Sequence, residues 1–400
     1  MVITYLDRVC ISVAGPRMQE ALHIGPVAWG WVTGIFTLSY AVFEIPSGAL
    51  GDRIGPRKVL TRIVLWWSGF TSLTGLVTGY YPLLAIRFFF GMGEAGAFPN
   101  ASVAIARWFP VRERGRAFGI SLMSSQLGGA IAPLLVVPIQ VHYGWRTSFY
   151  IFGFLGVIWS AAWYRWFRDS PAEKAGVSDA ELEETRDLVP NARHGLPWKA
   201  ALGSRNLWAT LAVAFCYVYT FSFFTSWLHT FLVKARGSSE NDLLLSSVPF
   251  LVGACGNFVG GLASHVLVKR LGLKWGRRSI GMVGLGIAAV CAVAVMFTHQ
   301  WLDALILLSF VYGGICFQQP TMFAVCLDIG GEYAGAVAGA MNTAAQVGAF
   351  VSSVMFGYLA DRYGSYDVPF IPMAALLFIG IWLWLKVDPC EALVPRSQPT

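Results

Sequence analysis

The length of the apolar stretches restricts the fold of this chain more than any other feature of its sequence. Twelve stretches can be drawn, and all but the first reach the roughly 20 residues that a helix needs to cross a bilayer. They cover residues 1–18, 28–50, 59–79, 82–106, 117–138, 146–167, 206–233, 244–268, 279–298, 301–326, 334–360 and 368–387. In lipid the backbone polar groups of each stretch must be bonded within the segment, so the spans are predicted to be helices.

The composition supports a membrane location. Only 13% of the residues are charged and 56% are hydrophobic, whereas a soluble domain carries about 25% charged residues. Such a chain could not cover its surface with polar groups in water, so lipid is its main solvent. The net charge of +7 could indicate nucleic acid binding, but the basic residues lie in short loops between apolar stretches, which is a pattern of membrane topology. We therefore expect no nucleic acid partner.

The first stretch is shorter than the others and carries Asp7 and Arg8. Its segment Ser12-Val13-Ala14 is similar to a signal-peptide cleavage site, but charges inside the apolar region argue against a signal peptide. We expect that the natural chain begins upstream and that the first helix lacks its cytoplasmic end.

Lysine and arginine gather in alternate loops, which predicts the orientation of the chain. With the N-terminus inside, the cytoplasmic loops hold Arg53, Arg57, Lys58, Arg107, Arg112, Arg114, Arg116, Lys269, Arg270, Lys274, Arg277 and Arg278. The opposite loops hold few, namely Arg17, Lys234, Arg236 and Arg362, with Arg146 at a helix end. This asymmetry places both termini in the cytoplasm.

One sizeable polar segment, residues 168–203, divides the chain into six spans and six spans. We interpret it as a cytoplasmic linker with a short acidic helix over 179–188. The predicted domains are an N-terminal bundle (1–167), the linker (168–203), a C-terminal bundle (204–388) and a cytoplasmic tail (389–400). Residues 48–58 and 260–272 occupy matching loops and share a glycine start and a basic end, so the two bundles are predicted to be repeats.

The loop between the second and third spans has the features of a conformational gate. Its glycines allow close helix contact, and its Asp52 can accept hydrogen bonds from helix N-terminal amides or pair with a basic residue. A plain charged turn is the alternative. The predicted gate residues are Gly48, Gly51, Asp52, Arg53, Arg57 and Lys58.

Four charged residues inside apolar stretches carry the functional argument: Asp7, Arg8, Arg87 and Glu94. A charge at the bilayer centre costs about 2.5–3.5 kcal/mol, so four unpaired charges would cost roughly 10–14 kcal/mol. They must therefore face one another or a watery cavity. Arg87 and Glu94 are seven residues apart and share one helix face, as do Tyr5 and Arg8, while Asp7 points about 100° away from Arg8.

Arginine suits a carboxylate ligand because its planar fork binds both oxygens. Two structural salt bridges are the alternative interpretation. The four charges sum to zero, so an added anion would make the site negative, and protons on Glu94 or Asp7 would restore the balance. This predicts coupling to H⁺. Glu44 lies nearer the cytoplasmic end, where a snorkelling or gate-pairing role is as plausible as a role in transport.

The chain shows no constellation that indicates an enzyme. The seven Cys lack paired metal spacing and the six His are scattered, so we expect no metal and no cofactor. No nucleophile and base stand in a catalytic arrangement.

Three motifs carry a family resemblance. They are Tyr5-Leu6-Asp7-Arg8, the loop 48–58, and Gly91-Met-Gly93-Glu94-Ala-Gly96-Ala-Phe98-Pro99 followed by Trp108-Phe109-Pro110-Val-Arg112-Glu113-Arg114. With them nearly the whole chain resembles the major facilitator superfamily. Within that superfamily it is similar to the anion:cation symporters, which include galactonate, glucarate, hexuronate and phthalate permeases.

The resemblance implies a set of site residues. Arg8 and Arg87 match residues that engage the substrate carboxylate, and Asp7 and Glu94 match proton carriers. The hydroxyl-bearing or amide residues that match substrate-contacting positions are Tyr5, Tyr40, Asn342 and Gln346. For the two amides, hydrogen bonding between helices is the alternative. The chain departs from the family pattern at Glu44, where a neutral polar residue is usual, at His229, where Pro is usual, and at Gln318-Gln319-Pro320.

We therefore predict an all-α membrane protein of twelve transmembrane helices in two pseudo-symmetric six-helix bundles. It would be a monomer in a bacterial cytoplasmic membrane, and would carry a small organic anion by proton-coupled symport and alternating access. A sugar acid is favoured over an aromatic acid because polar residues suited to hydroxyls occur in both halves. Anion exchange, coupling to Na⁺, drug efflux and a membrane-embedded anion sensor are the alternatives.

Overall fold

The computed structural model describes residues 1–109, 111–174, 176–178, 198–239 and 241–393. Side chains are described in these ranges except at residues 45, 48, 49, 51–53, 106, 111–116, 118, 198–200, 241 and 332. Within the described ranges all regular structure is helical, which agrees with the predicted fold class. The predicted acidic helix at 179–188 lies outside the described residues.

The first half contains six spans, of which the fourth is broken. The helices are α1 (Val2–Ala21), α2 (Pro26–Ile54), α3 (Pro56–Thr74), α4 (Tyr80–Glu94), α5 (Ala97–Trp108), α6 (Val111–Tyr143) and α7 (Trp145–Trp166). The apolar pattern predicted one continuous helix over 82–106, whereas α4 ends at Glu94 and α5 begins at Ala97. Gly96 causes the break because it adopts the left-handed conformation, with φ 86°.

The second half has the same organisation with a break in its first span. The helices are α9 (Trp198–Gly203), α10 (Arg205–Ser226), α11 (Leu228–Arg236), α12 (Ser247–Val295), α13 (Trp301–Gly330), α14 (Ala334–Tyr363) and α15 (Phe370–Trp384). Short 3-10 turns cover Pro171–Glu173, Asn241–Ser246 and Gly331–Tyr333. A glycine at position 272, with φ 76° and ψ 169°, interrupts α12 and divides it into two spans.

Counted this way, the structure contains the twelve spans that the sequence predicts. Among the described residues, six helical segments are long and apolar enough to cross a membrane by length and composition alone. Other spans fall short of that criterion for different reasons: Asp7 and Arg8 interrupt α1, Gly96 separates α4 from α5, and α15 is only 15 residues long.

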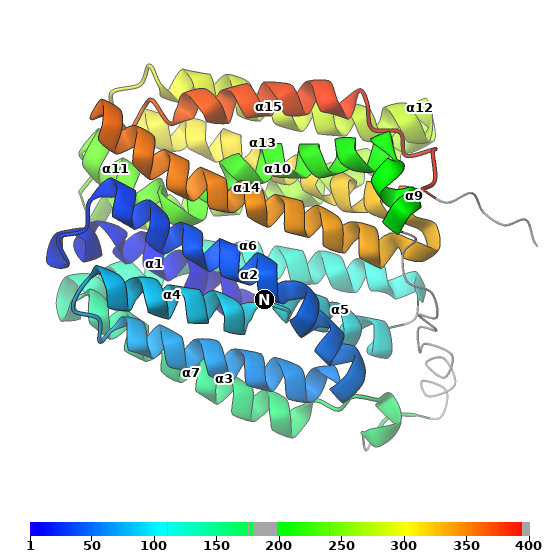
Figure 1. The fold of residues 1–400 in the computed structure, drawn as a ribbon, viewed down its shortest axis with the longest axis horizontal. Helices are drawn as coiled ribbons and strands as arrows, with labels where there is room; N and C mark the ends of the chain where they lie inside the picture. Colours follow the sequence, from blue (N-terminus) through cyan, green and yellow to red (C-terminus); the bar gives the residue numbers. More distant parts are fainter. Residues whose placement is uncertain (110, 175, 179–197, 240, 394–400) are drawn as a thin grey trace, which may run out of the picture.

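The spans run roughly parallel to one long axis, and the two halves lie side by side (Figure 1). They meet where α2 packs against α14, α1 against α10 and α11, and α6 against α12.

We call the end of the bundle that carries residues 168–178 and α9 the linker end, and the other end the opposite end. Residue 1 lies in the middle of the bundle, so α1 runs from there toward the opposite end (Figure 1).

Three glycine turns with nearly the same backbone conformation join consecutive spans. Gly55 has φ 87° and ψ 145°, Gly144 has φ 83° and ψ 156°, and Gly272 has φ 76° and ψ 169°. This region is essentially restricted to glycine because a Cβ would clash there. The turns connect spans two and three, five and six, and eight and nine. Their recurrence supports the predicted repeat, and extends it to units of three helices.

Replacing Gly272 by Ala is expected to lower the thermal stability of the purified protein, because an L-residue at this φ and ψ is strained by about 1–3 kcal/mol. No described atom lies within 4 Å of the position that the new Cβ would take, so the loss would report the backbone and not a clash. Gly286→Ala is the matched control, since Gly286 lies in α12 with equally open space and no positive φ. It should leave stability unchanged or raise it. Thermal unfolding in detergent measures both; equal melting of G272A and the native protein would contradict the expectation.

Candidate anion-binding site

A small cavity of about 110 Å³ lies between the two halves. Five of the predicted substrate-contacting residues line it: Tyr5, Arg8, Arg87, Asn342 and Gln346. Further lining residues come from α2 (Thr33, Phe36, Thr37), α10 (Tyr217, Val218, Phe221, Ser222, Thr225, Ser226), α13 (Gln319, Phe323) and α14 (Ala345, Ala349). The predicted residues of the first and fourth spans therefore meet residues of the second half in one polar chamber.

Arg8 is held in place by a carboxylate and by aromatic rings. Its Nε donates to Glu94 Oε1 at 2.6 Å. Its guanidinium carbon lies 4.9 Å from the ring centre of Tyr40 and 5.6 Å from that of Tyr5. Rings at these distances stabilise a cation through their π faces. Arg8, Glu94, Tyr5 and Tyr40 thus form one cluster. Tyr40 contacts Arg8 but is not among the residues that line the cavity, and a substrate-contacting role for either tyrosine stays a prediction.

Arg87 is buried, with only 5% of its surface exposed, yet it lacks a hydrogen-bond or ion-pair partner among the described residues. Its guanidinium carbon lies 4.6 Å from the ring centre of Phe36 and 5.0 Å from that of Phe90. The Phe36 ring also lies 5.3 Å from the guanidinium of Arg8. One aromatic side chain therefore supports both arginines, while the donors of Arg87 are not taken by the described protein groups.

The glycines of the fourth span explain how its charged residues approach α2. A Cβ at Gly91 would meet Ser39 and the Phe36 carbonyl, and a Cβ at Gly96 would meet Ser47. Beyond the break, the Asn100 amide donates to the carbonyls of Gly96 at 2.7 Å and Ser47 at 3.2 Å. These two bonds join the start of α5 to α2 close to the interruption.

Asp7 lies apart from the cavity lining. It is 4% exposed, and neither carboxylate oxygen has a hydrogen-bond partner among the described residues. Arg8 lines the cavity and Asp7 does not, which agrees with the predicted angle of about 100° between their side chains around the axis of α1. The predicted proton-carrying role of Asp7 stays a prediction.

Glu44 and Asn342 join the two halves. The Asn342 amide donates to Glu44 Oε1 at 2.5 Å, and Glu44 is only 5% exposed. Glu44 therefore does not snorkel to the surface, which was one of its three proposed roles. Asn342 and Gln346 are one helical turn apart and both line the cavity, as their spacing predicts.

The predicted gate loop is described in part. Residues 48–53 belong to α2, but the side chains of Gly48, Gly51, Asp52 and Arg53 lie outside the described set. The Arg57 amide donates to Asp169 at 2.8 Å, and its guanidinium donates to the Tyr164 carbonyl at 2.6 and 2.9 Å. Lys58 is exposed. Arg57 thus joins α3 to the end of α7 within one half, and a gating role for the loop stays a prediction.

At the opposite end a layer of hydrogen bonds closes the cavity. His229 of α11 bonds Ser12 through Nδ1 at 2.9 Å and Ser246 through Nε2 at 2.8 Å. Gln19 donates to the Thr230 hydroxyl at 2.9 Å and accepts from Lys234 at 3.0 Å. The sequence marked His229 only as a departure from the family pattern and gave no signal of these partners.

Sequence reasoning also gave no role to the further lining residues of the chamber, of which Phe36 and Gln319 bear most on its chemistry. Phe36 supports both arginines, and the only signal for it was its spacing of four residues from Tyr40. Gln319 lines the cavity with a buried oxygen that has no partner among the described residues. It stands in the Gln318-Gln319-Pro320 run, which the sequence singled out without a role.

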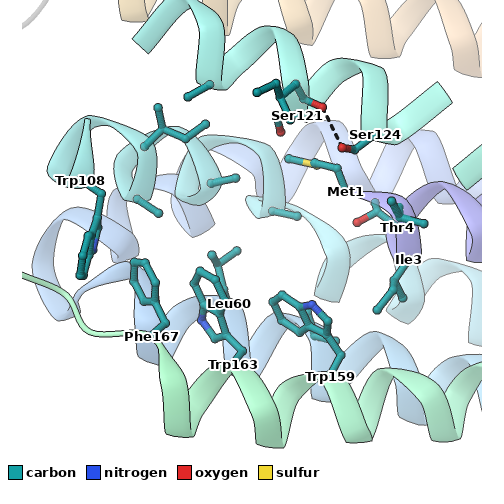
Figure 2. A pocket seen from close by; sticks show the side chains of 18 of the residues that line it. Met1, Ile3, Thr4, Leu60, Trp108, Ser121, Ser124, Trp159, Trp163 and Phe167 are labelled. Carbon is teal, nitrogen blue, oxygen red and sulfur yellow. Dashed lines mark hydrogen bonds between the residues drawn. The ribbon is translucent and has the colours of Figure 1, made fainter. Parts of the chain in front are cut away.

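A second and larger cavity, of about 990 Å³, lies within the first half. Figure 2 shows Met1, Ile3 and Thr4 on one side of it and Trp108, Trp159 and Trp163 on another. Besides the chain's amino group, Lys174 is the single charged residue among the described residues that line it. Its walls are apolar and aromatic, so it does not suit a small anion.

The fold and the chamber define a class of protein: a polytopic helical membrane protein with an arginine-lined chamber between two halves. The model of the Major Facilitator Superfamily matches residues 1–353 and again residues 274–399. The chain therefore belongs to the Major Facilitator Superfamily. It is a multi-pass membrane transporter for organic anions and not an enzyme.

Named relatives agree with this class. A probable sulfoacetate transporter of Cupriavidus necator is 37% identical over 393 residues, covering 97% of this chain and 91% of the relative. The hexuronate transporter of Bacillus subtilis is 28% identical, covering 92% and 88%. A bacterial homologue of the lysosomal transporter Spinster, in an inward-facing conformation, superposes with a TM-score of 0.76 at 19% identity, covering 96% and 94%.

Replacing Arg87 by Lys is expected to raise the Kd for a carboxylate probe about tenfold or more. Lysine keeps the charge but loses the planar fork, and one charge-assisted hydrogen bond is worth about 1.5–3 kcal/mol. Arg146→Lys is the control, because Arg146 binds the Val77 carbonyl at 3.1 Å outside the cavity. Calorimetry on the purified variants measures the affinities. An unchanged Kd for R87K would remove Arg87 from the site.

Proposed function

We propose that the protein carries a small organic anion together with protons, by alternating access of the central chamber to the two sides of the membrane. One observation carries this proposal most directly. Arg87 is buried in the wall of the chamber, and its donors have no protein partner among the described residues. A buried charge without a partner is costly, so its retention is explained if an anionic ligand pairs with it during transport.

The ion pair beside it supports coupling to protons. Arg8 lines the chamber while its Nε is bonded to Glu94. An anion that approaches Arg8 competes with this carboxylate for the same guanidinium. A proton on Glu94 removes the competing charge and leaves Arg8 to the ligand. Proton and anion binding would then favour each other, which is the requirement for symport.

The distribution of basic residues supports an orientation in which the linker end faces the cytoplasm. The basic loops of the sequence lie at the linker end, which by the positive-inside rule faces the cytoplasm. Both termini would then be cytoplasmic and the opposite end would face outward. Several relatives are bacterial transporters, and we propose that this chain lies in a bacterial cytoplasmic membrane as a monomer. Anion exchange remains the alternative to symport if protons prove irrelevant.

The substrate proposal has two candidates. A sugar acid is supported by the tyrosine and amide side chains of the chamber and by the hexuronate relative. A short acid with a sulfonate and a carboxylate is supported by the probable sulfoacetate transporter, which is 37% identical. Size favours the short acid in the present conformation, because the chamber holds about 110 Å³ and a cavity of about 150 Å³ is needed to hold benzene. A six-carbon acid would require the halves to separate further.

A panel of labelled anions in proteoliposomes distinguishes these candidates. We expect uptake of sulfoacetate or of D-galactonate and D-glucuronate, stimulated by an inward proton gradient, and little uptake of benzoate. The gradient is imposed with and without a protonophore. No uptake of any of these anions would overturn the proposal and favour efflux or a sensor, while uptake without response to protons would favour exchange.

Glu94→Gln is expected to abolish proton-driven accumulation while anion exchange across the membrane continues. The amide keeps the shape of the side chain but cannot take up a proton. Accumulation is measured against a pH gradient, and exchange is measured with labelled and unlabelled anion on opposite sides at equal pH. If E94Q still accumulates the anion to the native level, Glu94 does not couple protons.

A further inference from the structure

Glu44 is a buried carboxylate that the proposed function has not used. It stands on α2, ten residues before the end of that helix at Ile54, which is about 15 Å along the helix axis. One oxygen accepts from Asn342 of α14, and the other is buried without a partner among the described residues. The bond joins the two halves of the molecule beside the cavity that Asn342 lines.

The charged and titratable groups around Glu44 come from several elements. Arg8 of α1 and Tyr40 of α2 interact with it electrostatically. Arg8 is itself paired with Glu94 of α4. Arg62 of α3 reaches Ser47, three residues further along α2, at 3.5 Å. Among the described residues, α5 and α14 bring no charged side chain into hydrogen-bond or ion-pair contact with Glu44. Within that part of the chain, Glu44 therefore has no cation of its own.

The bond to Asn342 links the proton on Glu44 to the ligand chamber. An ionised carboxylate only accepts hydrogen bonds, so it requires the NH₂ group of Asn342 to face it. The amide oxygen is then the atom that Asn342 can offer to the chamber. A protonated Glu44 can donate its O–H to that oxygen instead. The side-chain amide of Asn342 then flips, so that its two N–H donors face the chamber, where they can bind an anion.

We propose that Glu44 is an additional proton-binding residue of the transport cycle, which acts on the anion through the orientation of Asn342. This inference rests on the proposed proton-coupled transport. With Glu44 included, the chamber region holds two arginines and three carboxylates, namely Arg8, Arg87, Asp7, Glu94 and Glu44. An entering anion therefore meets an excess of negative charge, and a proton on Glu44 relieves it. Glu44 is a positioning residue for Asn342 and does not itself contact the anion.

A purely structural contact between α2 and α14 is the competing explanation. The two helices already approach closely elsewhere, because a Cβ at Gly30 would meet Ser353 and a Cβ at Gly34 would meet Phe350. A structural contact could be made by any pair of hydrogen-bonding side chains. It would not change the number of protons that accompany the anion. The proton count therefore separates the two explanations.

The decisive experiment compares native protein, Glu44→Gln and Asp303→Asn in proteoliposomes. The amide introduced by E44Q can still bond Asn342 in the way a protonated Glu44 would, but it cannot release a proton. Asp303 is an exposed carboxylate at the start of α13 and controls for loss of a negative charge. The ratio of protons to anion is measured from the membrane potential at which flux reverses, with labelled sulfoacetate, or D-galactonate if the native protein prefers it. E44Q is expected to lower the ratio by about one, and D303N to leave it unchanged.

If E44Q does not transport, the same question is answered by binding to the purified protein. The slope of log Kd against pH between about pH 5 and pH 8 reports protons taken up with the anion, and E44Q should reduce this slope while D303N keeps it. An unchanged ratio, or an unchanged slope, in E44Q overturns the inference while the proposed symport stands. Native protein whose uptake ignores protons overturns the proposed function instead.

Discussion

The cost of charge in a membrane interior governs this structure. Arg8, Arg87, Asp7 and Glu94 cannot face lipid, so the helices that carry them must surround a common interior. The structure satisfies this constraint unevenly. Arg8 has a bonded carboxylate and two tyrosine rings, whereas Arg87 contacts aromatic faces and has no hydrogen bond or ion pair with a described residue. The cluster is thus complete as a scaffold but open toward a ligand, which is what a binding site needs and a structural salt bridge does not.

Glycine residues make this arrangement possible both in the site and in the turns between spans. Gly91 brings α4 against α2 and Gly96 breaks the span directly after Glu94, so that the charged face of α4 lies against the chamber wall. Gly55, Gly144 and Gly272 form the turns that repeat through the chain. The Asn100 side chain joins the two sides of the contact between α5 and α2, because it donates to the carbonyls of Gly96 and of Ser47 on α2. The same residue type therefore determines both the architecture and the geometry of the site.

The sequence predicted the spans, and it predicted that Arg8, Arg87 and Glu94 lie together, because each follows from a local property: an apolar run long enough to cross a bilayer, or a charge inside one. It failed where the outcome depends on distant partners. Glu44 bonds Asn342 across 298 positions of sequence, and His229 bonds Ser12 across 217. Phe36 is an ordinary apolar residue until two arginines from other helices lie on its ring. No periodicity or spacing encodes these contacts, which arise only when helices distant in the sequence pack together.

The contacts on either side of the chamber differ in kind, and this difference bears on how the halves could move. At the opposite end, Ser12, His229, Gln19 and Thr230 form side-chain hydrogen bonds, each worth about 0.5–1.5 kcal/mol net, and the Lys234 ammonium adds one bond to Gln19. Toward the linker end, the bond between Asn342 and Glu44 involves a carboxylate whose strength depends on its proton. Opening the first layer costs only a few kcal/mol, within the range that ligand binding can shift. Opening toward the linker end would depend on the proton on Glu44. Access from the two ends of the molecule would therefore respond to different ligands, one of which is the proton.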